Sequence, residues 1–206
     1  MLNIVVGEGE THQYAPGITA GEVIRNVHGR KSGAVAALVD GIERDMSQEL
    51  EDGQTIEPIL GESEAGLYIL RHSCAHLLAQ AVLEFYPNAK PTIGPPIENG
   101  FYYDFDIPGG VAIKEDELQK IENKMREIVK ADQAFVRGET SVEEALKMFS
   151  DHPYKCEIIE SADKSETDGS ETISFYQNGE GFVDLCRGPH VPSTGKVAHF
   201  KLMSVA

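Results

Sequence analysis

The longest regular stretch of the chain runs from Leu67 to Tyr86 and reads LYILRHSCAHLLAQAVLEFY. When successive residues are placed 100° apart, as in an α-helix, most apolar side chains fall on one broad stripe. This stripe consists of Leu67, Leu70, Cys74, Leu77, Leu78, Ala81 and Phe85. Pro87 ends the pattern, so we predict a long helix that packs on a core through this stripe.

Two histidines of this helix lie outside the stripe. His72 and His76 are four residues apart, so they project together from the opposite side, where Ala75 and Ala79 leave room for an approaching group. One interpretation is a solvated pair on an exposed face. The other is a site at which the two imidazoles act together.

A second group of reactive side chains lies at 182–190, FVDLCRGPH. On a strand, Asp184 and Cys186 leave the same face. Gly188 and Pro189 then turn the chain and can bring His190 back towards that face. A cysteine at the edge of the core and a histidine on a surface loop would be the alternative.

Together these residues are compatible with three kinds of chemistry. Three histidines and a thiolate, from His72, His76, His190 and Cys186, can hold zinc tetrahedrally. Without metal, the same groups can orient a water against an ester carbonyl and move a proton. Cys186 can also act as a nucleophile beside a histidine.

Residues 1–61 are predicted to form a separate small domain of β-β-α-β-β order, a ubiquitin-like β-grasp. The predicted elements are strands at 2–6, 11–14, 35–39 and 55–60 and a helix at 19–27. Thr19 and Glu22 form a capping box for the helix, and Asp40-Gly41 is a tight turn. Residues 61–66 are polar and small, and we interpret them as the linker.

Residues 62–206 are predicted to form a larger α+β domain. Besides the helix at 67–86, the patterns predict helices at 113–131 and 142–149, the latter capped by Ser141. Strands are expected at 100–106 and 154–159, and a hairpin at 173–177 and 181–186 through Asn178-Gly179. The segment 91–99 is expected to be loop or edge strand, and the polar segment 161–172 a mobile loop.

Composition narrows the class of protein. The chain has 206 residues and a formal net charge of −16, which argues against a non-specific nucleic-acid binder. Basic residues at 114–130 offer a possible phosphate contact, but their alternation with acids favours a solvated face. Three cysteines do not suggest a disulfide framework, and the chain shows no signal peptide and no membrane-spanning run, so we expect a cytoplasmic protein.

Three motifs then point to a family. RHSCAHLL at 71–78, IGPPIENGFYYD at 93–104 and VDLCRGPHVP at 183–192 resemble the editing domain of bacterial threonyl-tRNA synthetases. The resemblance includes the leading β-grasp module, called TGS in that family, and extends to residue 206. The related pairs HxxxH and CxxxH also occur in alanyl-tRNA synthetases, but the β-grasp module and the Cys186–His190 run favour the threonyl family.

The resemblance implies hydrolysis of the ester of mischarged seryl-tRNA(Thr), a proofreading step after aminoacyl transfer. Serine lacks one methyl of threonine, a difference worth roughly 1–3 kcal/mol in a pocket, so a second, hydrolytic site is needed. The implied catalytic residues are His72, His76, Lys155, Cys186 and His190. Asp184 would bind the amino group or hydroxyl of serine, and Tyr103 would form a wall. His72 would position or activate the water with help from the terminal ribose hydroxyl, without covalent catalysis by Cys186.

The resemblance also implies what accompanies this region. We expect no metal or other cofactor in it; zinc and Mg-ATP would belong to the aminoacylation domain, which this sequence lacks. The expected partner is the 3′ end of tRNA(Thr) carrying serine, with no membrane. The parent ligase would dimerise through its other domains and leave this part monomeric. The end of the chain within an apolar pattern at 200–206 fits a piece of a longer protein.

Two other classes stay open. One is a zinc-dependent hydrolase of a small molecule, and the other is a non-catalytic RNA-binding or regulatory module. For Lys155, an exposed lysine on a strand is the alternative to a role beside the ester.

Overall fold

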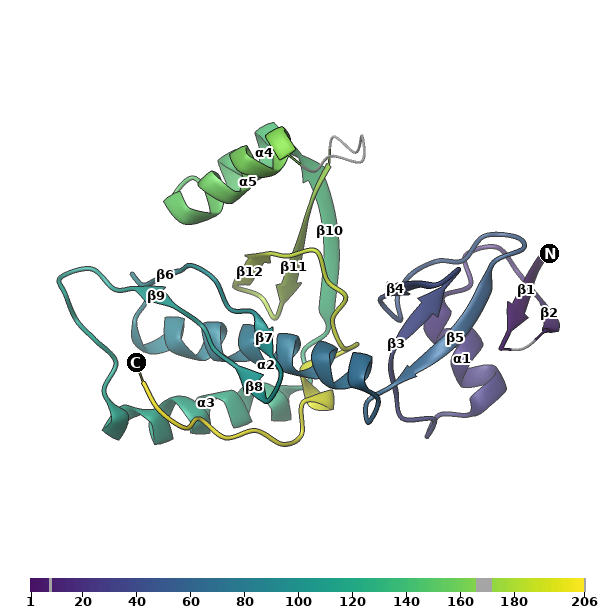
Figure 1. Ribbon diagram of the computed structural model, residues 1–206, viewed down its shortest axis with the longest axis horizontal. Coiled ribbons are helices and arrows are strands. Elements are labelled where there is room, and N and C mark those ends of the chain that lie inside the picture. The colour runs from purple at the N-terminus through teal and green to yellow at the C-terminus, as the bar shows by residue number, and fades with distance from the viewer. Residues whose placement is uncertain (8, 166–171, 206) are drawn as a thin grey trace.

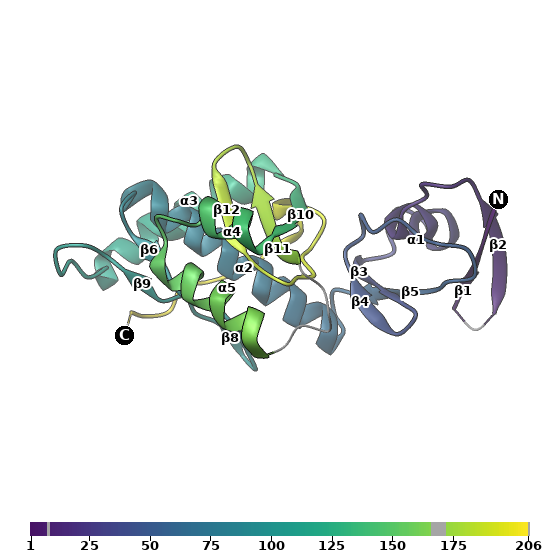
Figure 2. The same cartoon turned by 90° about the horizontal axis from the view of Figure 1, so that it is seen from above.

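The computed structural model describes residues 1–7, 9–165 and 172–205, and it shows a mixed α+β chain, as predicted. Two lobes follow one another along the molecule (Figure 1). The first contains the N-terminus, and the second is built around the long helix α2 (Glu64–Phe85). Viewed from above, α2 runs from the junction of the lobes deep into the second lobe (Figure 2).

The first lobe is a five-stranded sheet with one helix packed on it. Its strands are β1 (Leu2–Val6), β2 (Glu10–Tyr14), β3 (Ala34–Val39), β4 (Ile42–Arg44) and β5 (Thr55–Leu60), in the order β2-β1-β5-β3-β4. β1 and β5 are parallel, and the other pairs are antiparallel. The predicted strands and helix are confirmed; β4 is an additional short strand after the Asp40-Gly41 turn.

Helix α1 (Ala20–His28) begins as the capping box predicts. Thr19 accepts the Glu22 backbone N–H through its side chain, and Glu22 accepts the Thr19 N–H at 2.9 Å. The buried side chains of Val23 and Ile24 then join the core of the sheet. The local sequence signal and the packing therefore specify the same helix.

Helix α2 starts three residues earlier than predicted. The Ser63 side chain accepts the Gly66 N–H at 3.1 Å and caps the helix, so residues 64–66 are helical and the predicted linker is shorter. A Cβ at position 66 would lie 1.9 Å from the Leu60 carbonyl oxygen. Glycine at that position lets the first turn of the helix lie directly against the end of β5.

Both sides of α2 are covered by other elements. Helix α3 (Leu118–Ala131) packs along one side, while β7 (Pro96–Ile97) and β8 (Gly100–Phe101) contact another. The stripe residues Cys74, Leu77 and Ala81 are buried, as predicted, whereas Leu67 at the first turn is exposed. His76 is only 3% exposed, so the solvated interpretation is wrong for this histidine.

Helix α3 is shorter than the helix predicted from residue 113. A 3-10 turn, η1 (Glu115–Glu117), precedes it. Lys124 pairs with Glu84 and Glu127, and Arg126 pairs with Glu122 at 2.9 Å. The solvated face favoured by the sequence is confirmed for Glu127 but is wrong for Glu122, whose side chain is only 3% exposed and also pairs with Lys201.

The second lobe also contains a three-stranded antiparallel sheet. Its strands are β10 (Phe135–Ser141), β11 (Thr172–Asn178) and β12 (Phe182–Leu185), with β11 in the middle. The predicted hairpin is confirmed, but β10 was not predicted. Only Phe135 of this edge strand is buried, so its sequence lacks a clear apolar alternation.

The strand predicted at 154–159 is wrong, because this segment lies in helix α5 (Pro153–Ser165). Pro153 is at the first helical position, where its missing N–H costs nothing. Cys156 and Ile159, three apart, pack against Ala145 and Phe149 of the α4 (Val142–Met148) region. The helix predicted at 142–149 and its Ser141 cap are confirmed.

The predicted loop at 161–172 is partly wrong, since residues 161–165 continue α5 and Thr172 begins β11. Its remaining residues, 166–171, lie outside the described part of the chain. The single strand predicted at 100–106 is also wrong. The chain changes partner there: β8 pairs with β7, and β9 (Phe105–Asp106) pairs with β6 (Lys90–Pro91).

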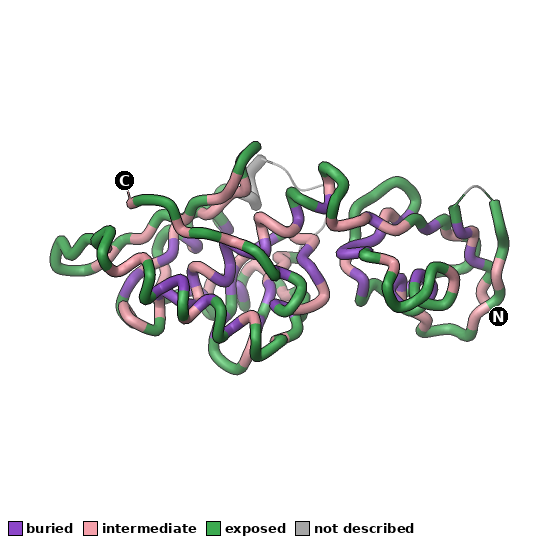
Figure 3. Tube along the Cα trace, turned by 90° about the horizontal axis from the view of Figure 1, so that it is seen from below, coloured by how far each residue is buried: buried purple, intermediate pink, exposed green. Residues whose placement is uncertain are grey.

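Buried segments gather within each lobe (Figure 3). The larger core cluster, around Leu77, Ile121 and Met125, also takes in Val35 and Ile59 from the first lobe. The two lobes therefore share apolar contact at their junction. The predicted division at residues 61 and 62 stays a prediction. None of the helices in the described ranges has the length and apolarity needed to cross a membrane.

Candidate active site

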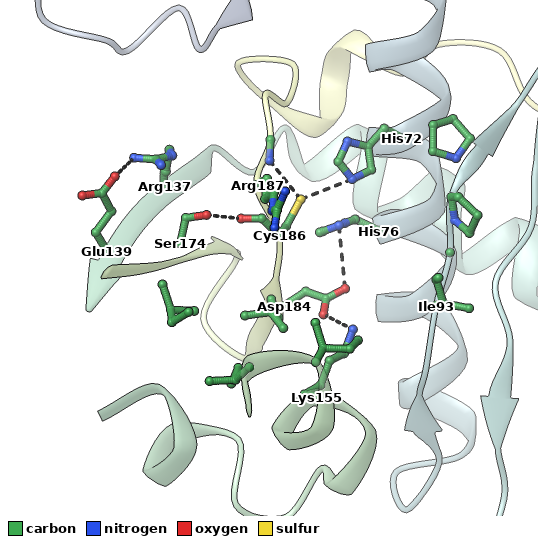
Figure 4. A pocket seen from close by; sticks show the side chains of 18 of the residues that line it. His72, His76, Ile93, Arg137, Glu139, Lys155, Ser174, Asp184, Cys186 and Arg187 are labelled. Carbon is green, nitrogen blue, oxygen red and sulfur yellow. Dashed lines mark hydrogen bonds and ion pairs between the residues drawn. The ribbon is translucent and has the colours of Figure 1, made fainter. Parts of the chain in front are cut away.

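A pocket of about 900 Å³ opens between α2, α5, the β10–β12 sheet and the segment 92–96. Figure 4 shows His72 and His76 projecting from the helix towards Asp184 on strand β12 and Cys186 just after it. The first lobe contributes Arg44 to the lining. Other lining residues used below are Gly94, Tyr103, Arg137, Lys155, Arg187 and Gly188.

Cys186 lies between two imidazoles. Its Sγ is 3.2 Å from His72 Nε2 and 3.2 Å from His190 Nε2. The Gly188 backbone N–H also donates to Sγ, at 3.3 Å. The turn after β12 thus brings His190 back to the cysteine, as the Gly-Pro sequence predicts.

His190 is held on every side. Its Nδ1 lies 3.0 Å from Ser73 Oγ, which donates to the Ile69 carbonyl and accepts the Val191 N–H. Because the one hydroxyl hydrogen goes to the carbonyl, Nδ1 is the donor to Ser73 and Nε2 presents a lone pair to Cys186. Phe135 stacks on the ring, with centroids 4.6 Å apart.

Asp184 organises a buried polar network. Lys155 Nζ lies 2.7 Å from Oδ1, and Tyr103 Oη donates to Oδ2 at 2.6 Å. His76 Nε2 is 3.7 Å from Oδ2. Asp184 is only 3% exposed; burial opposes its ionisation, but the Lys155 ammonium and the Tyr103 hydroxyl together hold the pKa of this carboxyl below its usual value.

Burial keeps the histidines of the site neutral. It lowers the pKa of His76 to about 3, against the attraction of Asp184, and lowers the pKa of His190 well below its usual value. Burial also lowers the pKa of the partly buried His72. The same desolvation raises the pKa of the Cys186 thiol to about 12, so this group is protonated near neutral pH.

Tyr103 forms a wall that is supported from behind. Its ring stacks on Phe105, with centroids 5.1 Å apart. A Cβ at Gly94 would lie 2.2 Å from the same ring, so the backbone there is in direct contact with it. With its hydroxyl on Asp184 as well, the ring has little room to retreat.

The structure brings together all seven residues that the sequence singled out. His72, His76, Tyr103, Lys155, Asp184 and Cys186 line the pocket, and His190 contacts Cys186 from behind. Lys155 is buried on a helix, so its alternative as an exposed strand lysine is wrong. The chemical role of each residue stays a prediction.

Four residues that position the site were missed. Ser73 and Phe135 fix the His190 ring, Tyr176 meets it edge-on at 4.5 Å, and Asp45 of the first lobe contacts its backbone. Only Ser73 carried a sequence signal, because it immediately follows His72. The other three residues lie in segments whose packing against His190 cannot be predicted from the local sequence pattern.

The four zinc-type ligands are close enough to hold an ion. The donor atoms of His72, His76, Cys186 and His190 all lie within 4.8 Å of one another. His76 Nδ1 is buried and has no hydrogen-bond partner among the described residues. Both observations suit either a metal ion or a polar ligand, so the donor set fits zinc without requiring it.

Curated proteins similar to this chain include threonine–tRNA ligases of several organisms. Threonine–tRNA ligase of Rubrobacter xylanophilus is 42% identical over 207 residues, covering 100% of this chain and 31% of that protein. Threonine–tRNA ligase of Thermobifida fusca is 46% identical over 212 residues, covering 96% of this chain and 31% of that protein. The enzyme of Thermotoga maritima is 42% identical over 207 residues, with 100% and 31% covered. Over its length, the chain is thus similar to one part of threonine–tRNA ligases.

It spans about 31% of the length of these ligases. A family model described as the threonyl and alanyl tRNA synthetase second additional domain matches residues 173–206. This matched segment includes Asp184, Cys186 and His190, whereas α2, with its two histidines, precedes it. The ligase family therefore agrees with the resemblance seen in the three sequence motifs.

Proposed function

We propose that this chain is the editing region of a threonine–tRNA ligase and hydrolyses the ester of seryl-tRNA(Thr). One observation carries the proposal: a single pocket joins the buried Lys155–Asp184–Tyr103 network to neutral imidazoles. A charged network can hold the amino acid, and neutral imidazoles can handle a water. The ligase relatives supply the substrate class, an aminoacyl ester on RNA.

Asp184 recognises the amino acid. Its carboxylate takes the ammonium or hydroxyl of serine, while Lys155 and Tyr103 hold it in place from the other side. The unpaired His76 Nδ1 offers a further contact for a polar group of the ligand. These groups are desolvated before substrate arrives, so each new hydrogen bond is formed in a low-dielectric setting.

The hydrolytic step needs a water and a proton carrier. His72, neutral and partly exposed to the pocket, takes a proton from water as the water oxygen bonds to the ester carbonyl carbon. The tetrahedral intermediate then breaks its bond to the ribose oxygen, which leaves as a hydroxyl after taking that proton from His72. The neighbouring ribose hydroxyl assists the alignment of the water, and Lys155 stabilises negative charge near the ester.

Cys186 acts through contact rather than by covalent attack. A thiol with a pKa of about 12 supplies almost no thiolate at neutral pH. Its sulfur instead links His72 and His190, at 3.2 Å from each. Its role is to keep the two rings at a fixed separation.

Discrimination against threonine comes from the supported wall. The extra methyl group would have to displace Tyr103, which is backed by Gly94 and Phe105, or take the place of the water. A methyl-sized difference is worth roughly 1–3 kcal/mol, enough for a second selection stage after the first.

The RNA end meets arginines at the pocket. Arg44, Arg137 and Arg187 line it, although the chain as a whole carries a net charge of −16. Guanidinium groups suit phosphates because they donate in a planar fork. We place the terminal phosphates of tRNA(Thr) on this side of the pocket rather than along α3.

The wider assignments follow the same proposal. Residues 1–61 form a TGS-type β-grasp domain, supported by the sheet order β2-β1-β5-β3-β4 with one packed helix, and 62–206 form the editing domain. The parent ligase attaches threonine to tRNA with ATP in the cytoplasm, with Mg-ATP and zinc in its aminoacylation domain and dimer contacts outside this region. The editing region itself works as a monomer and without a cofactor.

Release of radiolabelled serine from seryl-tRNA(Thr) by the 206-residue chain tests the proposal. We expect a rate far above that in buffer, and little release of threonine from threonyl-tRNA(Thr). His72→Ala should abolish most of the activity, while His28→Ala, at an exposed position of the first lobe, should not change it. A folded chain that releases no serine would refute the proposal.

A zinc-dependent hydrolase is the second candidate, favoured by the donor atoms that lie within 4.8 Å of one another. In that case His72, His76, Cys186 and His190 would hold the ion, which would supply a water of lowered pKa. One zinc per chain after dialysis, with hydrolysis lost to a chelator, would replace the metal-free mechanism. If the wild type shows no hydrolysis and variants that lack these side chains still bind RNA, the result would favour a non-catalytic module.

A further inference from the structure

The first lobe reaches the active site through the residues that follow β4. Asp45 there extends one carboxylate across the junction of the lobes. Its Oδ1 accepts the backbone N–H of His190 at 2.9 Å, and its Oδ2 accepts the Tyr176 hydroxyl at 2.6 Å. The preceding residue, Arg44, lines the pocket itself.

Both contacts act on the same imidazole. The backbone contact fixes the Cα of His190, and the Tyr176 ring lies edge-on to the His190 ring, with centroids 4.5 Å apart. The hydroxyl of Tyr176 also fills the space at Gly188, where a Cβ would come within 1.9 Å of it. The Asp45 carboxylate thus fixes the position of the His190 backbone and of the Tyr176 ring that packs against the turn 186–190.

The chemistry makes this contact a strong one. A carboxylate accepting from a backbone N–H and a phenol forms charge-assisted hydrogen bonds, which are shorter and stronger than neutral ones. Tyr176 is only 1% exposed, so its hydroxyl depends on Asp45 for a partner in a dry environment. Burial, with Asp45 beside it, raises the pKa of Tyr176, which keeps the phenol a donor.

We infer that Asp45 is a positioning residue of the active site, and that the first lobe thereby completes the site built by the second. Asp45 holds His190, and His190 Nε2 holds the Cys186 sulfur 3.2 Å away, on which His72 also rests. The part of this inference that concerns catalysis rests on the proposed hydrolysis.

A purely structural role would be to attach the lobes to each other. The two roles differ in what they change. Attachment alone affects stability, whereas positioning changes the orientation of the His190 ring and the rate of the chemical step. Substitution of groups that orient the ligands of a metal centre typically costs about 10- to 100-fold in activity, and we expect the same range for a group that orients His190.

The test compares Asp45→Asn with Asp40→Asn in the 206-residue chain. The control residue is a carboxylate of the same lobe that accepts only within it, from the Thr55 N–H and hydroxyl at 2.8 and 3.0 Å. Its positive φ of 49° is one that asparagine also adopts readily. Circular dichroism is used to choose an assay temperature at which all variants are folded.

Two measurements are made on each variant. The first is ¹H–¹⁵N NMR of the His190 backbone amide and ring nitrogens, which needs no substrate. The second is serine release, with kcat and KM determined separately. We expect Asp45→Asn to shift the His190 signals and to lower kcat about 10- to 100-fold with a smaller change in KM, and Asp40→Asn to match the wild type in both.

A further variant, Tyr176→Phe, removes one arm of the contact. Because both changes act on one imidazole, the losses from Asp45→Asn and Tyr176→Phe should not multiply in the double variant. Wild-type kcat together with unchanged His190 signals in Asp45→Asn would overturn the inference. If the wild type itself releases no serine, the proposed function fails, and the His190 signals alone then decide whether Asp45 positions the ring.

Discussion

Replacing Lys155 by methionine should destabilise the chain strongly, because it leaves the Asp184 carboxylate buried without its cation. The ammonium and carboxylate are 2.7 Å apart and their side chains are only 6% and 5% exposed. At an effective dielectric constant of about 20, a pair at this distance attracts by roughly 6 kcal/mol. Desolvating the two ions costs several kcal/mol each, so the intact pair contributes little net stability.

Removing only Lys155 lowers the stability, because the cost of burying the Asp184 charge remains while the attraction is lost. Breaking such a pair typically costs about 3–5 kcal/mol. With a urea dependence of about 2 kcal/mol per molar, the midpoint of unfolding should fall by roughly 2 M. The double variant Lys155→Met/Asp184→Asn should recover part of this loss, because no charge is then left unpaired.

The assay is urea unfolding followed by circular dichroism, with Lys147→Met as the matched control. Lys147 and Glu143 form an ion pair of similar length, 2.6 Å, but their side chains are 71% and 79% exposed. An exposed pair four residues apart on a helix contributes only about 0.3–0.5 kcal/mol. If Lys155→Met costs no more than Lys147→Met, the account of the buried network is wrong.

Acid provides a second check on the same variant. In the wild type the pKa of Asp184 is lowered, so its contribution to stability is present above the unfolded value of about 3.9 and is lost as the pH falls further. Without Lys155 the buried carboxyl prefers its proton, and the pKa moves the other way. The difference between wild type and variant should therefore be larger at pH 7 than at pH 4.

Three further outcomes follow from the site. His76, with a pKa of about 3, should show a neutral ring by NMR down to pH 4; because an unfolded histidine gains its proton near pH 6.5, this residue should also make folding less favourable as the pH falls from 6.5 to 3. A protonated ring at pH 6 would contradict the burial argument. Cys186, with a thiol pKa of about 12, should react with iodoacetamide at pH 8 far more slowly than a free thiol. Peptide mass spectrometry measures this rate, and rapid alkylation would support a nucleophilic role for Cys186. Gly188→Ala should lower the free energy of unfolding by about 1–3 kcal/mol and remove most of the hydrolysis, because its Cβ would lie 1.9 Å from the Tyr176 hydroxyl. Gly17→Ala, also at positive φ but with open space around it, should leave the activity unchanged. Equal activities of the two variants would show that the turn tolerates displacement.

Much of the fold was readable from local patterns. The capping box at Thr19, the Asp40-Gly41 turn, the Ser141 cap and the Asn178-Gly179 hairpin all rest on short-range hydrogen bonding, and each is present in the structure. The apolar stripe of α2 also packs as expected. These signals depend on few residues, so the rest of the chain cannot override them easily.

The failures have a common cause in tertiary contact. The segment 154–159 reads as a strand because of its apolar residues, yet Lys155 and Ile159 are buried together on one face of a helix. The lysine is buried because Asp184, 29 positions later, supplies its counter-charge. Strand β10 is defined by its pairing with β11 and not by its own sequence.

The candidate site divides in the same way. The spacing of His72 and His76 and the Cys186–His190 turn placed the reactive groups correctly, because four residues on a helix and a Gly-Pro turn determine local direction. The groups that support them come from distant parts of the chain. Asp45 lies 145 positions before His190, and its partners have no pattern that links them.

The mounting of the first lobe has a mechanical consequence. Besides the apolar contact at the junction, it is attached covalently at the end of β5, where Gly66 lies against the Leu60 carbonyl, and again through the Asp45 carboxylate. A body fixed at two separated points cannot swivel about either one alone. Any partner that tilts this lobe would therefore displace the helix bearing His72 and the turn bearing His190 at the same time. The distance between those two imidazoles would change with the tilt.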